Sequence, residues 1–83
     1  MRHARPEDLD QLEPLLARLR EIPGLTEKKR GTFYLKSRAF LHFHQDPAGF
    51  HADVRVSDDF VRFRVETAKE RNALVARVRA FLA

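Results

Sequence analysis

The sequence contains no cysteine among its 83 residues. Without cysteine the chain can form neither a disulfide framework nor a thiolate zinc site, and the composition suits a reducing compartment. No apolar run approaches the length of about 20 residues that a transmembrane helix needs. The N-terminal stretch, residues 1–6, also lacks the apolar core of a signal peptide. We therefore expect a cytoplasmic protein with no membrane partner.

The length is enough for one domain with a small core, so residues 1–83 are expected to form a single domain. Hydrophobic residues make up 43% of the chain, which is typical of a folded protein, and the formal net charge is +4. A basic balance of this kind favours acidic partners, nucleic acid among them. An arginine-rich surface that only aids solubility would give the same excess of positive charge, and composition does not distinguish these two explanations.

Residues 32–66 are expected to form the central sheet of the domain. Apolar and polar residues alternate through most of this stretch, which is the pattern of strands that bury one face. The predicted strands span residues 32–36, 38–44, 50–56 and 60–66, and consecutive strands pair as hairpins. The stretch therefore predicts a four-stranded antiparallel sheet.

The apolar residues also predict the register of the hairpins, because a slip of one residue would turn a whole strand over. A loop of residues 46–49 places every apolar residue of the second strand opposite an apolar residue of the third, with His42 opposite Asp53. Loops of residues 36–38 and 57–60 are expected in the other two hairpins. The pairs predicted there are Phe33 with Leu41, Leu35 with Ala39, Val54 with Phe63, Val56 with Val61 and Asp53 with Arg64.

This register divides the sheet into an apolar face and a polar face. The apolar face is expected to carry Phe33, Leu35, Ala39, Leu41, Phe43, Ala52, Val54, Val56, Val61, Phe63 and Val65. The polar face is expected to carry Tyr34, Phe40, His42, His44, His51, Asp53, Arg55, Arg62, Arg64 and Glu66. An antiparallel sheet can leave such a polar face in contact with water.

Two helices are expected to cover the apolar face. Residues 6–22 carry leucine and isoleucine at helical spacing, and Pro6 suits the first turn. Pro14 costs about 3 kcal/mol in a helix interior, so we expect either a kink there or a helix that begins near Glu13. Thr67 and Glu70 predict a capping box at the start of a second helix that runs to residue 83.

The segment between the first helix and the first strand, residues 25–31, is interpreted as a basic linker centred on Lys28, Lys29 and Arg30. The predicted element order is then α-β-β-β-β-α. Strands bracketed by helices in this way indicate an α+β fold, with both helices on one face of the sheet.

Residues 22–56 resemble the MmcQ/YjbR family of small bacterial proteins. The shared features are a Pro-Gly end to the first helix, an acidic residue after it, a glycine before the first strand, a Gly-Lys type of turn and a later hairpin loop. They are carried here by Ile22, Pro23, Gly24, Leu25, Glu27, Gly31, Phe33, Leu35, Ser37, Arg38, Phe40, Asp46, Gly49 and Phe50. The resemblance implies a compact fold like that of YjbR and the frataxin relative CyaY, implies the DNA binding predicted for the family, and brings no catalytic residues.

The predicted register gathers His42, His44, His51 and Asp53 on the polar face. Imidazole with carboxylate suits zinc, nickel or copper, and directly opposed side chains come close enough to share a cation. A flat strand surface supplies few converging ligands, however, and a cross-strand pair of His42 with Asp53 explains the same residues. We therefore expect no metal and no cofactor, and these four residues are the candidates if a metal binds.

No combination of residues indicates catalysis. The predicted row of Arg64, Asp53 and His42 has a carboxylate placed to orient an imidazole. No Ser or Cys nucleophile shares that face, and a charge ladder that stabilises the sheet is the simpler interpretation. We therefore expect no catalytic residues and a protein that is not an enzyme.

The candidate nucleic-acid contacts combine basic and aromatic side chains, since aromatics on an open sheet can stack bases while Arg and Lys contact phosphates. The candidates are Lys28, Lys29, Arg30, Tyr34, Phe40, Arg55, Arg62 and Arg64. A homodimer or another protein partner would explain exposed aromatics equally well. We predict a small binding module with nucleic acid as the first ligand to test, and a homodimeric or partner-binding protein as the alternative.

Overall fold

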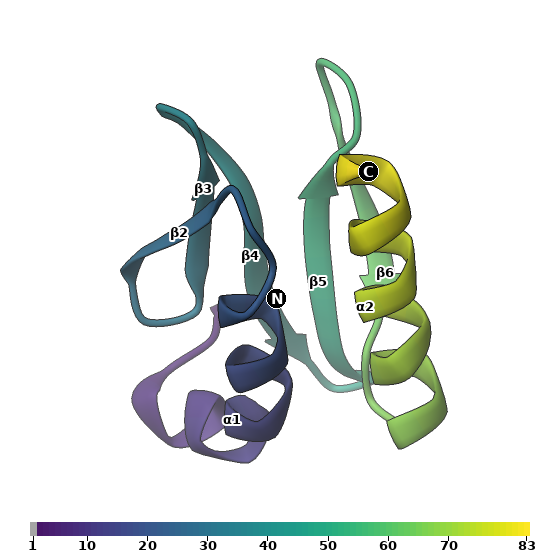
Figure 1. Cartoon of the computed structure of the whole chain (residues 1–83). Coiled ribbons are helices and arrows are strands. Elements are labelled where there is room, and N and C mark those ends of the chain that lie inside the picture. The colour runs from purple at the N-terminus through teal and green to yellow at the C-terminus, as the bar shows by residue number, and fades with distance from the viewer. Residues whose placement is uncertain (1) are drawn as a thin grey trace.

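The computed structural model describes residues 2–83, apart from the side chain of Arg2, and has an α+β fold with two helices and an antiparallel sheet (Figure 1). Met1, the first residue of the stretch predicted to lack a signal core, lies outside the described residues. The strands have the spatial order β2-β3-β4-β5-β6, and β1 pairs with β4. The elements are β1 (Arg2–His3), α1 (Pro6–Arg20), β2 (Leu25–Lys29), β3 (Thr32–Leu35), β4 (Arg38–Asp46), β5 (Gly49–Arg55), β6 (Phe60–Arg64) and α2 (Ala68–Leu82).

The prediction of four strands is wrong, because residues 25–29 form the strand β2 and not a linker. β2 runs antiparallel to β3, with Leu25 opposite Leu35 and Glu27 opposite Phe33. Glu27 is one of its two half-buried residues, and its carboxylate accepts a hydrogen bond from the backbone N–H of Gly31 at 2.9 Å. Because this partly buried position holds a charged residue, the sequence shows no apolar alternation and the strand escapes detection.

The predicted register of the β4–β5 hairpin is confirmed. His42 lies opposite Asp53, and Leu41 lies opposite Val54. The pairing continues to the end of the hairpin, where Asp46 lies opposite Gly49. This register fixes which side chains of the two central strands share the polar face.

The β3–β4 hairpin departs from its prediction at Phe40. The expected pair of Phe33 with Leu41 is present, but Tyr34 lies opposite Ala39, so Phe40 is the extra residue of a β-bulge. The bulge turns the ring of Phe40 into the core, where it is only 2% exposed. The prediction that Phe40 lies on the polar face is therefore wrong, as is the predicted pairing of Leu35 with Ala39.

The β5–β6 hairpin is shifted by two residues from the predicted register. Val54 lies opposite Val61, and Asp53 lies opposite Arg62 instead of Arg64. A two-residue shift keeps every side chain on its face, and both registers place apolar residues opposite one another, so alternation alone could not distinguish them. Phe60, which the predicted loop of residues 57–60 left unpaired, lies opposite Arg55 on the polar face.

Both helices begin with the capping chemistry that their sequences predict. Pro6 is the first residue of α1, and the helix continues through Pro14 to Arg20. At the start of α2 the hydroxyl of Thr67 accepts a hydrogen bond from the backbone N–H of Glu70, whose carboxylate accepts one from the N–H of Thr67. Within residues 2–83 neither helix is long and apolar enough to cross a membrane.

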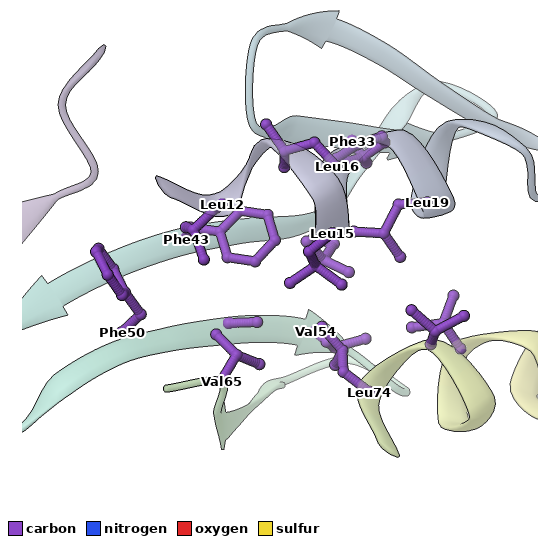
Figure 2. Close-up of a cluster of buried hydrophobic side chains, with 14 of the residues drawn as sticks. Leu12, Leu15, Leu16, Leu19, Phe33, Phe43, Phe50, Val54, Val65 and Leu74 are labelled. Carbon is purple, nitrogen blue, oxygen red and sulfur yellow. The ribbon is translucent and has the colours of Figure 1, made fainter. Parts of the chain in front are cut away.

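The core lies between the two helices and one face of the sheet. In Figure 1, α2 lies in front of β6 and beside β5, and α1 lies at the lower left, below β2 and β3. Figure 2 shows leucines of α1 directed toward strand residues and toward Leu74 of α2. The strands contribute Phe33, Phe40, Leu41, Phe43, Phe50, Ala52 and Val54 to this cluster. Within residues 2–83 the opposite, polar face of the sheet has no helix over it, and this face holds the candidate site.

Candidate functional site

Three histidines meet on the polar face, where β1 runs beside β4. His42 and His44 alternate along β4 and so share this face, and the β1–β4 pairing places His3 directly opposite His44. The Nε2 atom of His44 lies 2.9 Å from Nδ1 of His42, and the ring centroids of His3 and His44 are 4.6 Å apart. One donor nitrogen from each ring falls within 4.8 Å of the other two. We refer to His3, His42 and His44 as the histidine cluster.

A buried carboxylate borders the histidine cluster. Asp53 of β5 is 7% exposed, and one of its oxygens lies 3.1 Å from Nε2 of His44. Arg62 donates a hydrogen bond to each oxygen of the Asp53 carboxylate, from Nε to Oδ1 at 2.7 Å and from Nη2 to Oδ2 at 2.9 Å. Burial acts to raise the pKa of Asp53, but the hydrogen bonds and charge of Arg62 outweigh it and hold this pKa below its usual value. Asp53 is therefore an ionised carboxylate near neutral pH.

The environment of His42 favours its neutral form. Burial lowers the pKa of His42, and the charge of the neighbouring His44 lowers it further. The ring of Phe60 packs against it on the other side, with centroids 4.8 Å apart. A neutral imidazole has one unprotonated ring nitrogen, whose lone pair can take up a proton, accept a hydrogen bond or bind a metal ion.

The structure changes the membership of the predicted metal cluster. His42, His44 and Asp53 come together as expected, and His51 lies opposite His44 in the predicted register. The imidazole of His51 instead approaches Asp46, with 3.7 Å between Nδ1 and the carboxylate oxygen. His3 takes its place, since the cluster of close donor atoms within residues 2–83 comprises His3, His42 and His44.

Several of the predicted nucleic-acid contacts are engaged inside the molecule. Arg30 binds the carboxylates of Asp10 and Glu13 on α1. Arg64 binds Glu70 of α2 at 3.1 Å, and the fork of Arg62 is filled by Asp53, as described above. A guanidinium held by a carboxylate must break that pair before it contacts a phosphate, so these arginines are weaker candidates than the sequence suggests.

Three of the other predicted contacts, Lys28, Tyr34 and Arg55, take part in two cation–aromatic pairs. The ammonium of Lys28 lies 4.7 Å from the centroid of the Tyr34 ring, and the guanidinium of Arg55 lies 4.5 Å from that of Phe60. Arg55 also donates a hydrogen bond to the carbonyl of Ala39 at 2.8 Å. These pairs put charge and ring surface on the polar face.

A second surface feature is apolar and lies where β5 ends and β6 begins. The exposed fractions of Phe60, Val61 and Phe81 are 37%, 40% and 46%. Figure 1 shows the C-terminal end of α2, which carries Phe81, beside the end of β5 and the loop that leads to β6. Two hollows of about 320 and 250 Å³ adjoin this region, and both are lined by Val56 and Phe81. The ring of Phe81 stacks on that of Phe40 of β4, with centroids 5.9 Å apart, and leaves its remaining surface exposed.

Sequence reasoning missed His3 and Phe60 as members of the polar face. His3 belongs to a two-residue strand, which is too short to produce an alternation pattern. Phe60 could have been found, because it alternates with Arg62 and Arg64, but the register two residues away placed it in a loop.

Comparison of the chain with protein-family models, with curated proteins and with solved structures returned no match.

Proposed function

We propose that this chain is a non-enzymatic protein-binding module that pairs with a second copy of itself through the outer edge of β6. The proposal is supported by the exposed Phe60 and Val61 on a strand that, within residues 2–83, has a neighbour on only one side. An uncovered apolar edge strand is a ready template for pairing with another chain. Phe81 and the two adjoining hollows extend this apolar surface on the helix side.

The sequence of β6 is complementary to itself when two copies run antiparallel about Arg62. Val61 of one copy then lies opposite Phe63 of the other, on the helix side of the joined sheet. On the polar side Phe60 lies opposite Arg64, which gives a cation–aromatic contact at each end. A two-fold contact needs a self-complementary surface of this kind.

The charges along β6 fit the same arrangement. Arg62 would meet its own copy at the symmetry axis, and its charge is already balanced by the buried carboxylate of Asp53. Asp58 and Asp59 precede the strand, and in this register they lie beside Glu66 and Val65 of the other copy, beyond the paired residues 60–64. The attractive polar contacts are therefore the two pairs of Phe60 with Arg64.

Sedimentation equilibrium of Val61→Lys tests the self-association directly. The unmodified chain should sediment as a dimer at micromolar to millimolar concentrations. Val61→Lys should weaken the dimer by about tenfold or more, because the symmetric contact introduces the charge twice on an apolar surface. Thr26→Lys is the matched control, since Thr26 is exposed on β2 at the other edge of the sheet, and it should leave the dimer unchanged.

A monomer at every concentration would reject the proposal. Equal weakening by Val61→Lys and Thr26→Lys would also reject the β6 edge as the contact. The loss of dimer would then follow from the added positive charge and not from its position on β6.

A second candidate function is nucleic-acid binding through the polar face, and the two cation–aromatic pairs favour it. Lys28 and Tyr34 lie on β2 and β3, and Arg55 and Phe60 on β5 and β6, so the pairs span the sheet. Aromatic rings flanked by cations are the elements that bind single strands. Lys29 is exposed next to the first pair. The resemblance to the MmcQ/YjbR family, which stays a prediction, points the same way.

Fluorescence anisotropy with a short single-stranded DNA tests this second candidate at several salt concentrations. Binding should weaken as salt rises, and replacing both Lys28 and Lys29 by alanine should reduce the slope of log K against log salt by about 1.4, at roughly 0.7 per phosphate contact. The control replaces Lys69 and Arg79, two exposed cations of α2, and should keep the slope. A site on the polar face would be rejected if no binding is seen at low salt. It would also be rejected if the replacement of Lys69 and Arg79 lowers the slope as much as that of Lys28 and Lys29.

A further inference from the structure

The histidine cluster supports an inference about a site whose three histidines lie on β1 and β4, and which touches the edge strand β6 through Phe60 and Arg62. We propose that His3, His42 and His44 form a binding site for a divalent transition-metal ion, with Zn²⁺ as the ion to test. Imidazole nitrogen is the common protein ligand for Zn²⁺ and its neighbours in the first transition row.

The spacing of the donor atoms is close to that of a ligand set. Two nitrogens bound at 2.0–2.1 Å to a tetrahedral Zn²⁺ lie roughly 3.3 Å apart. Nε2 of His44 and Nδ1 of His42 are 2.9 Å apart, and all three donors lie within 4.8 Å of one another. The rings would have to turn to bring three nitrogens around one ion, and the ion would replace the hydrogen bond between His42 and His44.

A carboxylate lies beside the donor nitrogens. An oxygen of Asp53 is 3.1 Å from Nε2 of His44, and Arg62 fixes the position of this carboxylate with two hydrogen bonds. A carboxylate oxygen this close to a donor nitrogen is placed to serve as a further ligand of the same ion. Three imidazoles leave the fourth position of a tetrahedral ion for Asp53 or for a water molecule.

The site would join β1 to β4. β1 has two residues and pairs with β4 through His3 and Arg2, followed by one hydrogen bond from the N–H of Ala4 to the carbonyl of Phe43 at 3.2 Å. A metal ion bound by His3 and by His42 and His44 would fix β1 on the sheet. Metal binding therefore predicts slower amide exchange at Ala4.

Calorimetric titration of Zn²⁺ into untagged, chelator-treated protein tests the site, with Co²⁺ absorption as a second probe of tetrahedral coordination. One ion should bind per chain. His3→Gln should lower the affinity by at least about tenfold, the smallest loss that removal of even an outer-shell partner causes, and it replaces an exposed side chain. His51→Gln is the matched control, because His51 lies on the same face outside the cluster, and it should leave the affinity unchanged.

Hydrogen exchange measured on the same samples gives a readout separate from affinity. Zn²⁺ should slow the exchange of the Ala4 amide in the unmodified chain and in His51→Gln, and it should not do so in His3→Gln. The proposal is overturned if millimolar Zn²⁺ does not bind, if His3→Gln binds as tightly as the unmodified chain, or if His51→Gln weakens binding as much as His3→Gln.

Discussion

At the scale of single residues, Gly31 shows how the absence of a side chain allows two elements to meet. It forms the turn between β2 and β3 with a φ of +82°, a backbone conformation that residues with a side chain rarely adopt. It is also buried, and a Cβ atom there would come within 2.6 Å of Cδ2 of Leu9 on α1. Leu9 is 7% exposed and packed in the core, so it has little room to move away.

Replacement of Gly31 by alanine should destabilise the protein more than the same change at Gly24. Both glycines have positive φ, so each substitution pays a conformational cost of roughly 1–2 kcal/mol. Only at Gly31 does the new methyl group clash, since the nearest atom to a Cβ at Gly24 is Cδ1 of Leu35 at 3.7 Å. Overpacking should add about 1–3 kcal/mol at Gly31. Urea unfolding of the two variants measures the difference, and equal losses would contradict the clash.

At the scale of elements, the sequence predicts the central hairpin and loses accuracy toward the edges of the sheet. The β4–β5 register was predictable because a one-residue slip would place His42 among the core residues Ala52 and Val54. The shift of β6 was not predictable in this way, because a shift of two residues keeps each face intact. Val61 lies 40% exposed on that edge strand, so burial constrains its partner weakly.

The elements that decide the candidate site are the ones that leave the weakest signal in the sequence. The bulge at Phe40 moves a predicted base-stacking ring into the core. The alternation of apolar and polar residues does not reveal the extra residue of a bulge. The strand β1 has two residues, and it brings His3 to the two histidines of β4. The sequence could place those two histidines on one face, but the third ligand depends on a contact across about 40 residues of chain.

At the scale of the whole molecule, the charges are separated between α1 and the remaining chain. Residues 6–21 carry five acidic and two basic side chains, although the protein as a whole is basic. The turn between β2 and β3 reaches across to this acidic helix, where Arg30 binds Asp10 and Glu13. Arg20 of the helix binds Glu13 as well and also Glu27 of β2. Glu13 thus stands at the centre of the ion pairs that join α1 to the edge of the sheet.

The position of Glu13 predicts how this junction responds to acid. Hydrogen bonds from Arg20 and Arg30 lower the pKa of Glu13 from 4.5 to about 2. A carboxyl group whose pKa is lower in the folded state stabilises the fold above its unfolded pKa, and this stabilisation disappears as the pH falls through the folded pKa. The contribution of Glu13 should therefore be complete above about pH 4.5 and lost near pH 2.

Denaturant unfolding of Glu13→Gln and the unmodified chain at a series of pH values measures this contribution. The two should differ in unfolding free energy at pH 6 and converge as the pH approaches 2, because the neutral glutamine resembles the protonated glutamic acid. Glu21→Gln, at an exposed position at the C-terminal end of α1, is the control for replacing one acidic side chain of this segment by glutamine. A difference between Glu13→Gln and the unmodified chain that stays constant from pH 6 to pH 2 would mean that the ion pairs of Glu13 do not stabilise the junction of α1 with the sheet.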